Sequence, residues 1–389
     1  MSAEEIYGKL GVPAAVNAVG TGTLVGGSGP PEFVREAMEA ASGRFVKMDD
    51  LLRACGDAIA AQVGTEAAYI SCGGAAGVTL SAAACIAGTD PAAIRRLPDA
   101  GGLRNEIVVQ KRHSDSYDRC LRAAGARLVE VGREDGCDAA ELEAGITADT
   151  VAIWYPWPPL GDQTGLYPEM PGPDEIVPLE EAHAIGRRRG VPVIADAASD
   201  IYPLDFMRRC AAAGDLVVFG GKYFGGPNAS GFVCGDRGLI EAVAAQGFTM
   251  PAGAMGIGRS MKLDRQQVIA LTVAVERWFA TDHAARFAAI DRRLAVVEQA
   301  LQGLPHVRLE PHMVTHGFYG SFLVVELDTA ALGRTARQIA EELYVGEPSV
   351  LVQSPTESTL WVFFYTVEDG EERIIADRMR AVLARVVSR

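Results

Sequence analysis

Several signatures of common protein classes are missing from this 389-residue sequence. No apolar run reaches the ~18 residues that a membrane-spanning helix needs, so the sequence predicts no membrane partner. The N-terminal stretch MSAEEIYGKLG lacks the basic and apolar pattern of a secretion signal. No low-complexity tail and no fixed-period repeat is present. These absences favour an ordinary globular protein.

The seven cysteines are scattered along the chain and form no CxxC pair. An odd number of dispersed cysteines is not the pattern of a disulfide framework or of a zinc site. We therefore predict free thiols in a reducing cytoplasm and no metal centre.

Positive charge is also scarce, with 36 Lys and Arg against 50 Asp and Glu and a formal net charge of −14. Proteins that bind nucleic acid ordinarily present an excess of basic residues, so this balance argues against a nucleic-acid partner. No DNA-binding segment is evident at either end, which argues against a non-catalytic, cofactor-binding regulator.

Apolar residues make up 49% of the chain, and its length favours two domains. Strand and helix patterns alternate across residues 65–235, which predicts a mainly parallel, doubly wound α/β sheet with helices on both faces. A helical stretch over 264–304, broken near Asp282, and further strands and helices then indicate a smaller α+β domain. The predicted organisation is an N-terminal arm over 1–30, a large domain over 31–262 and a small C-terminal domain over 263–389.

One lysine directly follows a predicted buried strand, in DLVVFGGKYFGGPNASG over residues 215–231. The glycines around Lys222 let the backbone turn sharply and approach a bound group closely. A lysine amine made reactive by such surroundings can form a Schiff base with pyridoxal phosphate. A surface lysine in a turn after a core strand is the alternative.

A second glycine-rich turn, Cys72-Gly73-Gly74-Ala75-Ala76-Gly77, connects a predicted strand over 67–71 to a helix of small residues. Free backbone N–H groups and the positive end of the helix dipole make such a turn suitable for a phosphate. A tight packing turn between strand and helix is the alternative.

Asp196 ends the predicted strand VPVIAD, where its carboxylate suits the protonated nitrogen of a pyridine ring. His113 follows the predicted strand over 105–110 and is placed to stack on one face of that ring, with Ala198 against the other. A helix cap for Asp196 and a structural role for His113 are the alternatives. Ligands of doubly wound sheets bind at the carboxyl ends of the strands, so the shared position of these residues and Lys222 after strands predicts one site.

Three stretches of the chain resemble fold-type I pyridoxal-phosphate enzymes, in the branch related to bacterial selenocysteine synthase (seryl-tRNA selenium transferase) and D-glucosaminate-6-phosphate ammonia-lyase. They are SCGGAAG over 71–77, NEIVVQKRHSDSYDRCLRAAGARLVEVG over 105–132, and residues 191–231, from VPVIADAAS to GGKYFGGPNASG. The segments VNAVGTGTLVGGS and GRSMKLDRQQ are also similar to this branch. The likeness covers most of the chain and is specific for cofactor and fold rather than for substrate.

The resemblance implies an aspartate aminotransferase-like fold and pyridoxal 5'-phosphate as cofactor. It implies three catalytic residues, with Lys222 forming the Schiff base, Asp196 facing the pyridine nitrogen and His113 stacking on the ring. The full predicted cofactor-binding set is Ser71, Gly73, Gly74, Ala75, Ala76, His113, Asp196, Ala198, Ser199 and Lys222. Many aminotransferases carry a serine or histidine just before the lysine, where this chain has Phe219-Gly220-Gly221. A hydroxyl for the phosphate must then come from elsewhere, such as Ser71, or from a partner subunit.

No late arginine that would clamp a substrate carboxylate is identifiable. Arg259 and Lys262 are the predicted contacts for anionic substrate groups, with solvated loop charges as the alternative. The long loop over 158–177 is rich in proline and glycine and is expected to border a pocket or an interface. Together with the arm over 1–30, this loop predicts a homodimer or a larger even assembly.

Lys222, once the substrate displaces it from the cofactor, would lie beside the substrate Cα and act as general base. We expect β-elimination from an amino acid or amino sugar acid, which yields a keto acid and ammonia. Aldol cleavage, racemisation and amino transfer use the same residues and are the alternatives. The seryl-tRNA reaction is disfavoured because the chain is acidic.

Overall fold

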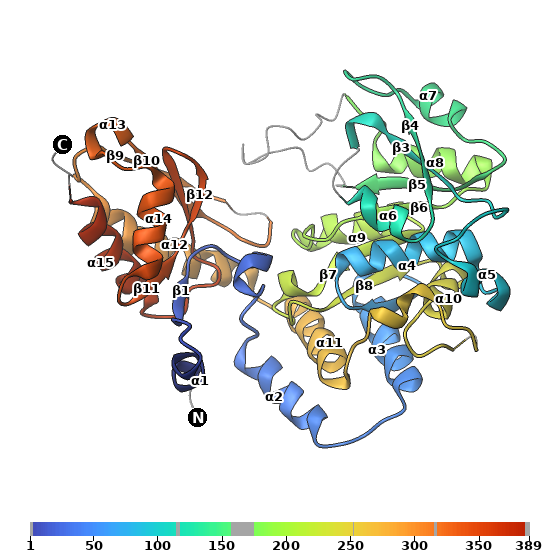
Figure 1. Ribbon diagram of the computed structural model, residues 1–389, viewed down its shortest axis with the longest axis horizontal. Helices are drawn as coiled ribbons and strands as arrows, with labels where there is room; N and C mark the ends of the chain where they lie inside the picture. The colour runs from blue at the N-terminus through green and yellow to red at the C-terminus, as the bar shows by residue number, and fades with distance from the viewer. Residues whose placement is uncertain (1–2, 114–116, 157–174, 252, 315–316, 386–389) are drawn as a thin grey trace. The chain divides into compact units, whose positions relative to one another are not determined.

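The computed structural model describes residues 3–113, 117–156, 175–251, 253–314 and 317–385 (Figure 1). The chain forms two compact units, Pro30–Ala280 and a second one that joins Met1–Gly29 to Thr281–Arg389. The first unit ends at residue 280 rather than at the expected residue 262. The reason is that α11 (Arg265–Phe279) packs against two helices of that unit, α2 (Glu32–Ser42) and α3 (Met48–Val63).

A seven-stranded sheet in the order β2-β8-β7-β6-β5-β3-β4 forms the centre of the first unit (Figure 1). Its strands are β2 (Ala67–Ser71), β3 (Glu106–Gln110), β4 (Arg127–Val131), β5 (Thr150–Pro156), β6 (Val193–Asp196), β7 (Leu216–Gly220) and β8 (Gly231–Gly235). Neighbours from β7 to β4 are parallel, whereas β8 runs antiparallel to both β2 and β7. The predicted mainly parallel α/β sheet is confirmed, with β8 as its antiparallel member.

Helices cover both faces of this sheet, which explains why most of its strands are apolar without alternation. On one face α4 (Gly74–Ala87) lies close to the strands, since a Cβ on Gly77 would come within 2.9 Å of Val218 Cγ1. On the other face lie α8 (Leu179–Arg189) and α9 (Leu204–Ala213). The remaining helices of the unit are α5 (Pro91–Arg96), α6 (Asp118–Ala123), α7 (Ala139–Ala144) and α10 (Arg237–Ala245), with 3₁₀ turns η2 (Lys111–His113), η3 (Gly221–Phe224) and η4 (Ile257–Ser260).

The second unit contains a four-stranded antiparallel sheet in the order β12-β13-β10-β9 and a small parallel pair, β1 with β11. These strands are β1 (Ala15–Asn17), β9 (Val307–His312), β10 (Phe322–Leu327), β11 (Ser349–Leu351), β12 (Gln353–Thr356) and β13 (Thr359–Phe363). Its helices are α1 (Ala3–Lys9), α12 (His283–Leu301), α13 (Thr329–Leu332), α14 (Ala336–Val345) and α15 (Glu371–Leu383), with the 3₁₀ turn η1 (Thr23–Val25). The predicted break near Asp282 separates α11 from α12, whose first turn Asp282 caps by accepting from Ala285 N at 3.0 Å.

The N-terminal arm packs within its own chain. Besides the β1–β11 pairing, the amide of Thr21 donates to the Tyr365 hydroxyl at 2.8 Å and the amide of Phe363 donates to the Ala18 carbonyl at 2.9 Å. Residues 15–21 therefore pack within their own unit, so they give no support to the predicted use of the arm in a subunit contact.

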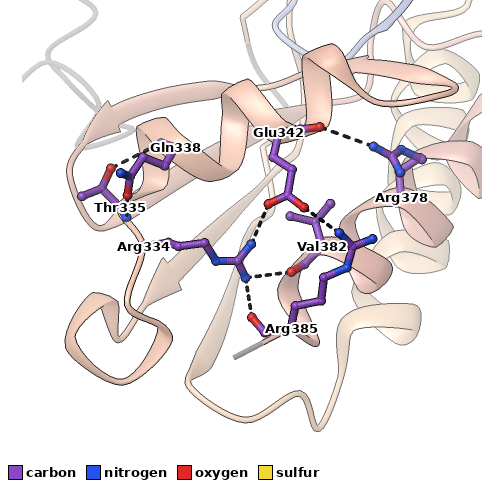
Figure 2. A network of polar contacts seen from close by, with 7 residues as sticks. All are labelled: Arg334, Thr335, Gln338, Glu342, Arg378, Val382 and Arg385. Atoms are coloured by element: carbon purple, nitrogen blue, oxygen red, sulfur yellow. Dashed lines mark hydrogen bonds and ion pairs between the residues drawn. The ribbon is translucent and has the colours of Figure 1, made fainter. Parts of the chain in front are cut away.

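A polar network joins α14 to α15 in the same unit (Figure 2). Arg334 Nη1 bonds Glu342 Oε2 at 2.7 Å, and Arg385 Nη1 bonds the other carboxylate oxygen at 2.9 Å. Arg334 Nη2 also donates to the Val382 carbonyl at 2.9 Å. The network therefore holds the C-terminal helix through one carboxylate shared by two arginines.

The cysteines and the helix lengths agree with what the sequence predicted. All seven cysteines are free thiols, as expected. Within the ranges that the structure describes, no helix has the length and apolarity that crossing a membrane requires.

Candidate active site

The sheet topology brings the ends of β2, β6 and β7 to one edge. β6 and β7 are parallel neighbours with Asp196 opposite Val218. Gly220 at the end of β7 and Ser71 at the end of β2 both lie opposite Gly231 of β8. The segments that follow these strands, which hold Lys222, Asp196 and the glycine turn, therefore meet at the same edge, as the sequence predicted.

Lys222 lies in η3, directly after β7, and is half-buried. The turn is fixed by backbone bonds from Gly220 N to the Ala198 carbonyl at 2.9 Å and from Gly221 N to the Ser230 carbonyl at 2.8 Å. Burial lowers the pKa of the Lys222 amine, and its Nζ lies 5.1 Å from the centre of the Tyr223 ring. A lower pKa leaves more of the amine neutral and nucleophilic near pH 7.

The two glycines before Lys222 are required by space. A Cβ on Gly221 would come 2.1 Å from Ser230 Oγ, and one on Gly220 would come 2.8 Å from the Tyr223 ring. This explains why no serine or histidine precedes the lysine here, where many aminotransferases carry one.

The glycine turn forms the bare N-terminus of α4, a helix of 14 residues. Its N-cap is Gly73 at φ 140°, a conformation that suits glycine, and no side chain caps the helix. The first intrahelical bond runs from Gly77 N to Gly73 O at 3.0 Å, so the amides of Gly74, Ala75 and Ala76 precede the helical ladder. Such a terminus is an anion site.

Ser71 has a different place from the one expected. Its hydroxyl donates to the Gly73 carbonyl at 2.9 Å, and the residue is 2% exposed. The bond shapes the turn, and it directs the hydroxyl at the protein rather than at a phosphate.

Asp196 lies at the end of β6 and is half-buried. Its Oδ1 accepts from Ala198 N at 3.0 Å, in a turn that carries Ala198 and Ser199. The next helix begins only at Leu204, with Pro203 as its N-cap. The helix-cap alternative for Asp196 is therefore excluded.

The turn after Asp196 also reaches the start of α4. A Cβ on Gly74 would come within 3.6 Å of Ala198 Cβ, so the Asp196 turn and the start of α4 are in contact range.

His113 is 2% exposed at the end of η2, and its ring packs edge-on against Tyr155, with 4.6 Å between the ring centres. Burial lowers the pKa of His113 to about 4, so the imidazole is neutral at pH 7. Neither ring nitrogen has a hydrogen-bond partner among the residues that the structure describes. Buried polar atoms of this kind are uncommon and are typical of sites that bind something.

Two groups near these residues, the half-buried Asp200 and the buried Tyr155, escaped the sequence analysis. Burial first, and the charge of Asp196 second, raise the pKa of Asp200 to about 7. Burial also raises the pKa of the Tyr155 hydroxyl, which finds no partner in the described ranges. Asp200 follows directly in the ADAASD segment, but its charge state depends on burial, which no local pattern reveals.

Arg259 and Lys262 lie in and just after η4, a 3₁₀ turn that packs against α4. Arg259 lies in η4, where Gly258 N donates to the Gln246 carbonyl at 3.0 Å. Gln246 in turn donates to the carbonyl of Gly88, the C-cap of α4. η4 also packs against the middle of α4, since a Cβ on Gly258 would come 2.9 Å from Leu80 Cδ2. The two cations line an open pocket of their own with Leu97, Pro98 and Met255.

Most of the predicted loop over 158–177 lies outside the described residues. Its last residues are held against η2 and β3, because Arg112 bonds Glu175 at 2.7 Å and Gln110 exchanges two bonds with the backbone of Val177.

The donor set fits pyridoxal phosphate. The edge offers a half-buried amine of lowered pKa at Lys222, a carboxylate at Asp196, a bare helix N-terminus at Gly74 and a neutral imidazole at His113. These are the groups that the carbonyl, ring nitrogen, phosphate and ring face of this cofactor require. The contacts themselves remain predictions.

The chain matches no protein-family model. It is 34% identical over 353 residues to 5'-C-glycyluridine monooxygenase-decarboxylase from a Streptomyces species, covering 89% of this chain and 84% of the relative. It is 27% identical over 384 residues to D-glucosaminate-6-phosphate ammonia lyase from Salmonella typhimurium, covering 97% of each chain. A solved structure of D-glucosaminate-6-phosphate ammonia-lyase matches 99% of this chain with a TM-score of 0.82 and 24% identity.

Proposed function

The chain belongs to the family of fold-type I pyridoxal-phosphate enzymes that includes 5'-C-glycyluridine monooxygenase-decarboxylase and D-glucosaminate-6-phosphate ammonia lyase, and from this premise we propose that it is a lyase. Its substrate would be an amino acid or amino sugar acid with a hydroxyl at Cβ. The supporting observation is the convergence of Lys222, Asp196 and the bare start of α4 at one sheet edge.

Each residue has a defined task in this proposal. Lys222 Nζ would hold the carbonyl carbon of the cofactor and would take the Cα proton of the substrate, for which its lowered pKa suits it. Asp196 would hold the proton of the ring nitrogen, and the amides of Gly74–Ala76 would bind the phosphate. His113 would lie against the ring as a neutral imidazole. Pyridoxal phosphate itself supplies a ring that accepts the electron pair of the broken Cα–H bond.

The remaining bond changes of the elimination take place at Cα and Cβ of the substrate. The electron pair from Cα would expel the Cβ hydroxyl, which would leave as water with the proton that Lys222 took from Cα. Water hydrolyses the resulting product to a keto acid and ammonia. Aldol cleavage, racemisation and amino transfer begin from the same constellation and are separated from elimination by their products.

A second reaction has a specific observation behind it. The relative that shares 34% identity is named for oxygenation and decarboxylation rather than for ammonia loss. Such a reaction would consume dioxygen and release carbon dioxide from the substrate carboxylate, which elimination does not.

The test compares the two reactions directly. The purified enzyme is incubated with β-hydroxy amino acids and amino sugar acids, with and without dioxygen, while keto acid, ammonia, carbon dioxide and oxygen uptake are measured. Keto acid and ammonia formed equally in both atmospheres support the lyase. Product that forms only with dioxygen, together with carbon dioxide, supports the second reaction and overturns the first.

We further propose a homodimer or larger even assembly in which Arg259 and Lys262 serve the site of the neighbouring chain. The support is the open pocket that they line, which contains none of the predicted cofactor-binding residues of their own chain. In mixtures of inactive Lys222→Ala and inactive Arg259→Ala subunits, hybrids with one intact site should regain part of the activity. No recovery despite proven exchange of subunits would place Arg259 outside any shared site.

A further inference from the structure

A separate cavity of about 290 Å³ lies beside the beginning of β2, whereas the candidate active site lies beyond its end. β2 is the edge strand of the sheet, and the cavity is lined by residues of β2, α3 and α10. None of the predicted cofactor-binding residues lines it. Its volume is at the small end of the range for ligand pockets, roughly 300 Å³ and upward.

The wall of this cavity contains a buried hydroxyl with no partner. Tyr69, which lines the cavity together with the apolar residues Leu52 and Ile240, is 6% exposed. Its hydroxyl finds no hydrogen-bond partner in the described part of the chain. A Cβ on Gly247 would come 2.2 Å from that oxygen, so the phenol reaches across to the loop after α10 that carries the cavity residues Thr249 and Pro251. A buried hydroxyl without a partner needs an explanation, and a group bound in the adjoining cavity would supply one.

The rim of the cavity carries three carboxylates. Asp49 and Asp57 are two helical turns apart on one face of α3, and Glu241 faces them from α10. No side-chain hydrogen bond or ion pair holds any of the three among the described residues.

The two arginines on the same rim are engaged elsewhere. Arg53 pairs with Asp50 at 2.7 Å. Arg237 donates from its side chain to the carbonyl of Glu66, and its backbone amide bonds the Glu66 carboxylate at 3.2 Å. The rim therefore keeps an excess of negative charge over an apolar floor.

We propose that this cavity is a binding site for a small organic cation. The ammonium group lies among the carboxylates of Asp49, Asp57 and Glu241, and the apolar part packs against Leu52 and Ile240. Charge-assisted bonds to carboxylates and the face of an aromatic ring are the groups that recognise such cations in proteins. The inference does not depend on the proposed reaction.

The experiment uses N,N-dimethylbutylammonium as probe, since a tertiary amine forms no imine with pyridoxal phosphate. Calorimetric titration of the full-length protein should show saturable binding that weakens with added salt. Hexan-1-ol and hexanoate, of similar size, should bind much more weakly because they lack the positive charge. Asp57→Asn and Glu241→Gln should each weaken probe binding by about tenfold, the scale of one charge-assisted bond. Tyr69→Phe should weaken it as well.

Two matched controls keep the result specific. Glu36→Gln, on the exposed face of α2 and away from the cavity, should bind the probe as the wild type does. Lys222→Ala should also bind it normally, so a failed proposal for the reaction leaves this test intact. Equal binding of hexan-1-ol, unchanged affinity in Asp57→Asn and Glu241→Gln, or loss of binding in Lys222→Ala would overturn the proposal. A change of oligomer mass in the Asp57→Asn or Glu241→Gln variants would instead identify this face as an interface and overturn it too.

Discussion

In the α14–α15 network both carboxylate oxygens of Glu342 are bonded by arginines, whereas in the candidate active site neither ring nitrogen of His113 is bonded within the described ranges (Figure 2). Both groups are polar and at least partly buried. Satisfying a buried polar group contributes stability, and leaving one without a partner costs it. The comparison therefore sets a carboxylate with both oxygens paired against an imidazole with neither nitrogen paired, and Arg334 Nε in the same network is also buried without a partner in the described residues.

The helix starts differ in the same way. α14 begins with a capping box, in which Thr335 and Gln338 bond each other's backbone amides (Figure 2). α4 begins at Gly73 with no side-chain cap. A cap occupies the first amides of a helix, whereas a bare start leaves them for an anion. If this comparison is correct, substitutions at the two regions have different consequences.

The largest effect is expected for Lys222→Ala. The amine is the predicted point of attachment and the general base, so the variant should lose the imine absorbance and turnover together, by several orders of magnitude. Its melting temperature should stay close to that of the wild type measured without cofactor. Lys47→Ala removes an exposed lysine and should change neither property. Normal turnover in the Lys222→Ala protein would show that Lys222 is neither the attachment point of the cofactor nor the general base.

Asp196→Asn should keep the cofactor but lower kcat by roughly 10²–10⁴-fold, the scale of one catalytic proton or charge contact. The amide still accepts from Ala198 N, so the turn is preserved, but it cannot keep the ring nitrogen protonated. Steady-state kinetics with bound cofactor measured by absorbance separates the two effects. Asp205→Asn, at an exposed carboxylate, is the control. An unchanged kcat would leave Asp196 with only a structural role.

The central sheet and the position of the candidate site could be predicted from the sequence, because both depend on local patterns of apolar residues and glycines. The strand before Lys222 is apolar throughout and has glycines after it, which are enough to place it in a covered sheet with a turn at its carboxyl end. β2 was predicted with its observed bounds, Ala67–Ser71. The site at the strand ends follows from the topology of such sheets.

The rest depended on contacts between distant segments. The helical pattern over 264–304 does not reveal that α11 packs on α2 and α3 and so belongs to the first unit. The position of Arg259 is set by the bonds of η4 to Gln246, not by its own sequence. The altered pKa of Asp200 arises from burial and from Asp196, four residues away in the chain.

A substitution at Glu342 tests whether the paired carboxylate contributes to stability. Glu342→Gln removes the charge that two arginines share, one of which has a side chain only 12% exposed. The free energy of unfolding should fall by about 1–3 kcal/mol, while activity per folded molecule stays the same. Glu341→Gln, at the exposed neighbouring position, should change stability by less than about 0.5 kcal/mol. Urea unfolding of both variants gives the values, and equal stability of the two would show that the network contributes little.

The smallest effect at neutral pH is expected for His113→Phe, and it grows as the pH falls. Phenylalanine has a similar shape and removes two buried nitrogens that have no partner in the described part of the chain, so at pH 7.5 stability should be unchanged or slightly higher. In the wild type the pKa of His113 is lowered to about 4 in the folded state, against 6.5 when unfolded. Between these values the unfolded chain binds more protons than the folded one, so acid favours unfolding of the wild type.

The variant lacks this titration, so the stability of the wild type should fall behind that of His113→Phe as the pH drops below about 6.5, by about 2 kcal/mol at pH 5. The gap should level off near pH 4, where the folded imidazole also takes up a proton. Urea unfolding of the two proteins without cofactor, in matched buffers at pH 7.5, 6 and 5, measures it. Parallel stability curves across this range would mean that His113 is protonated in the folded protein as easily as in the unfolded chain, and that the contrast with the paired Glu342 does not hold.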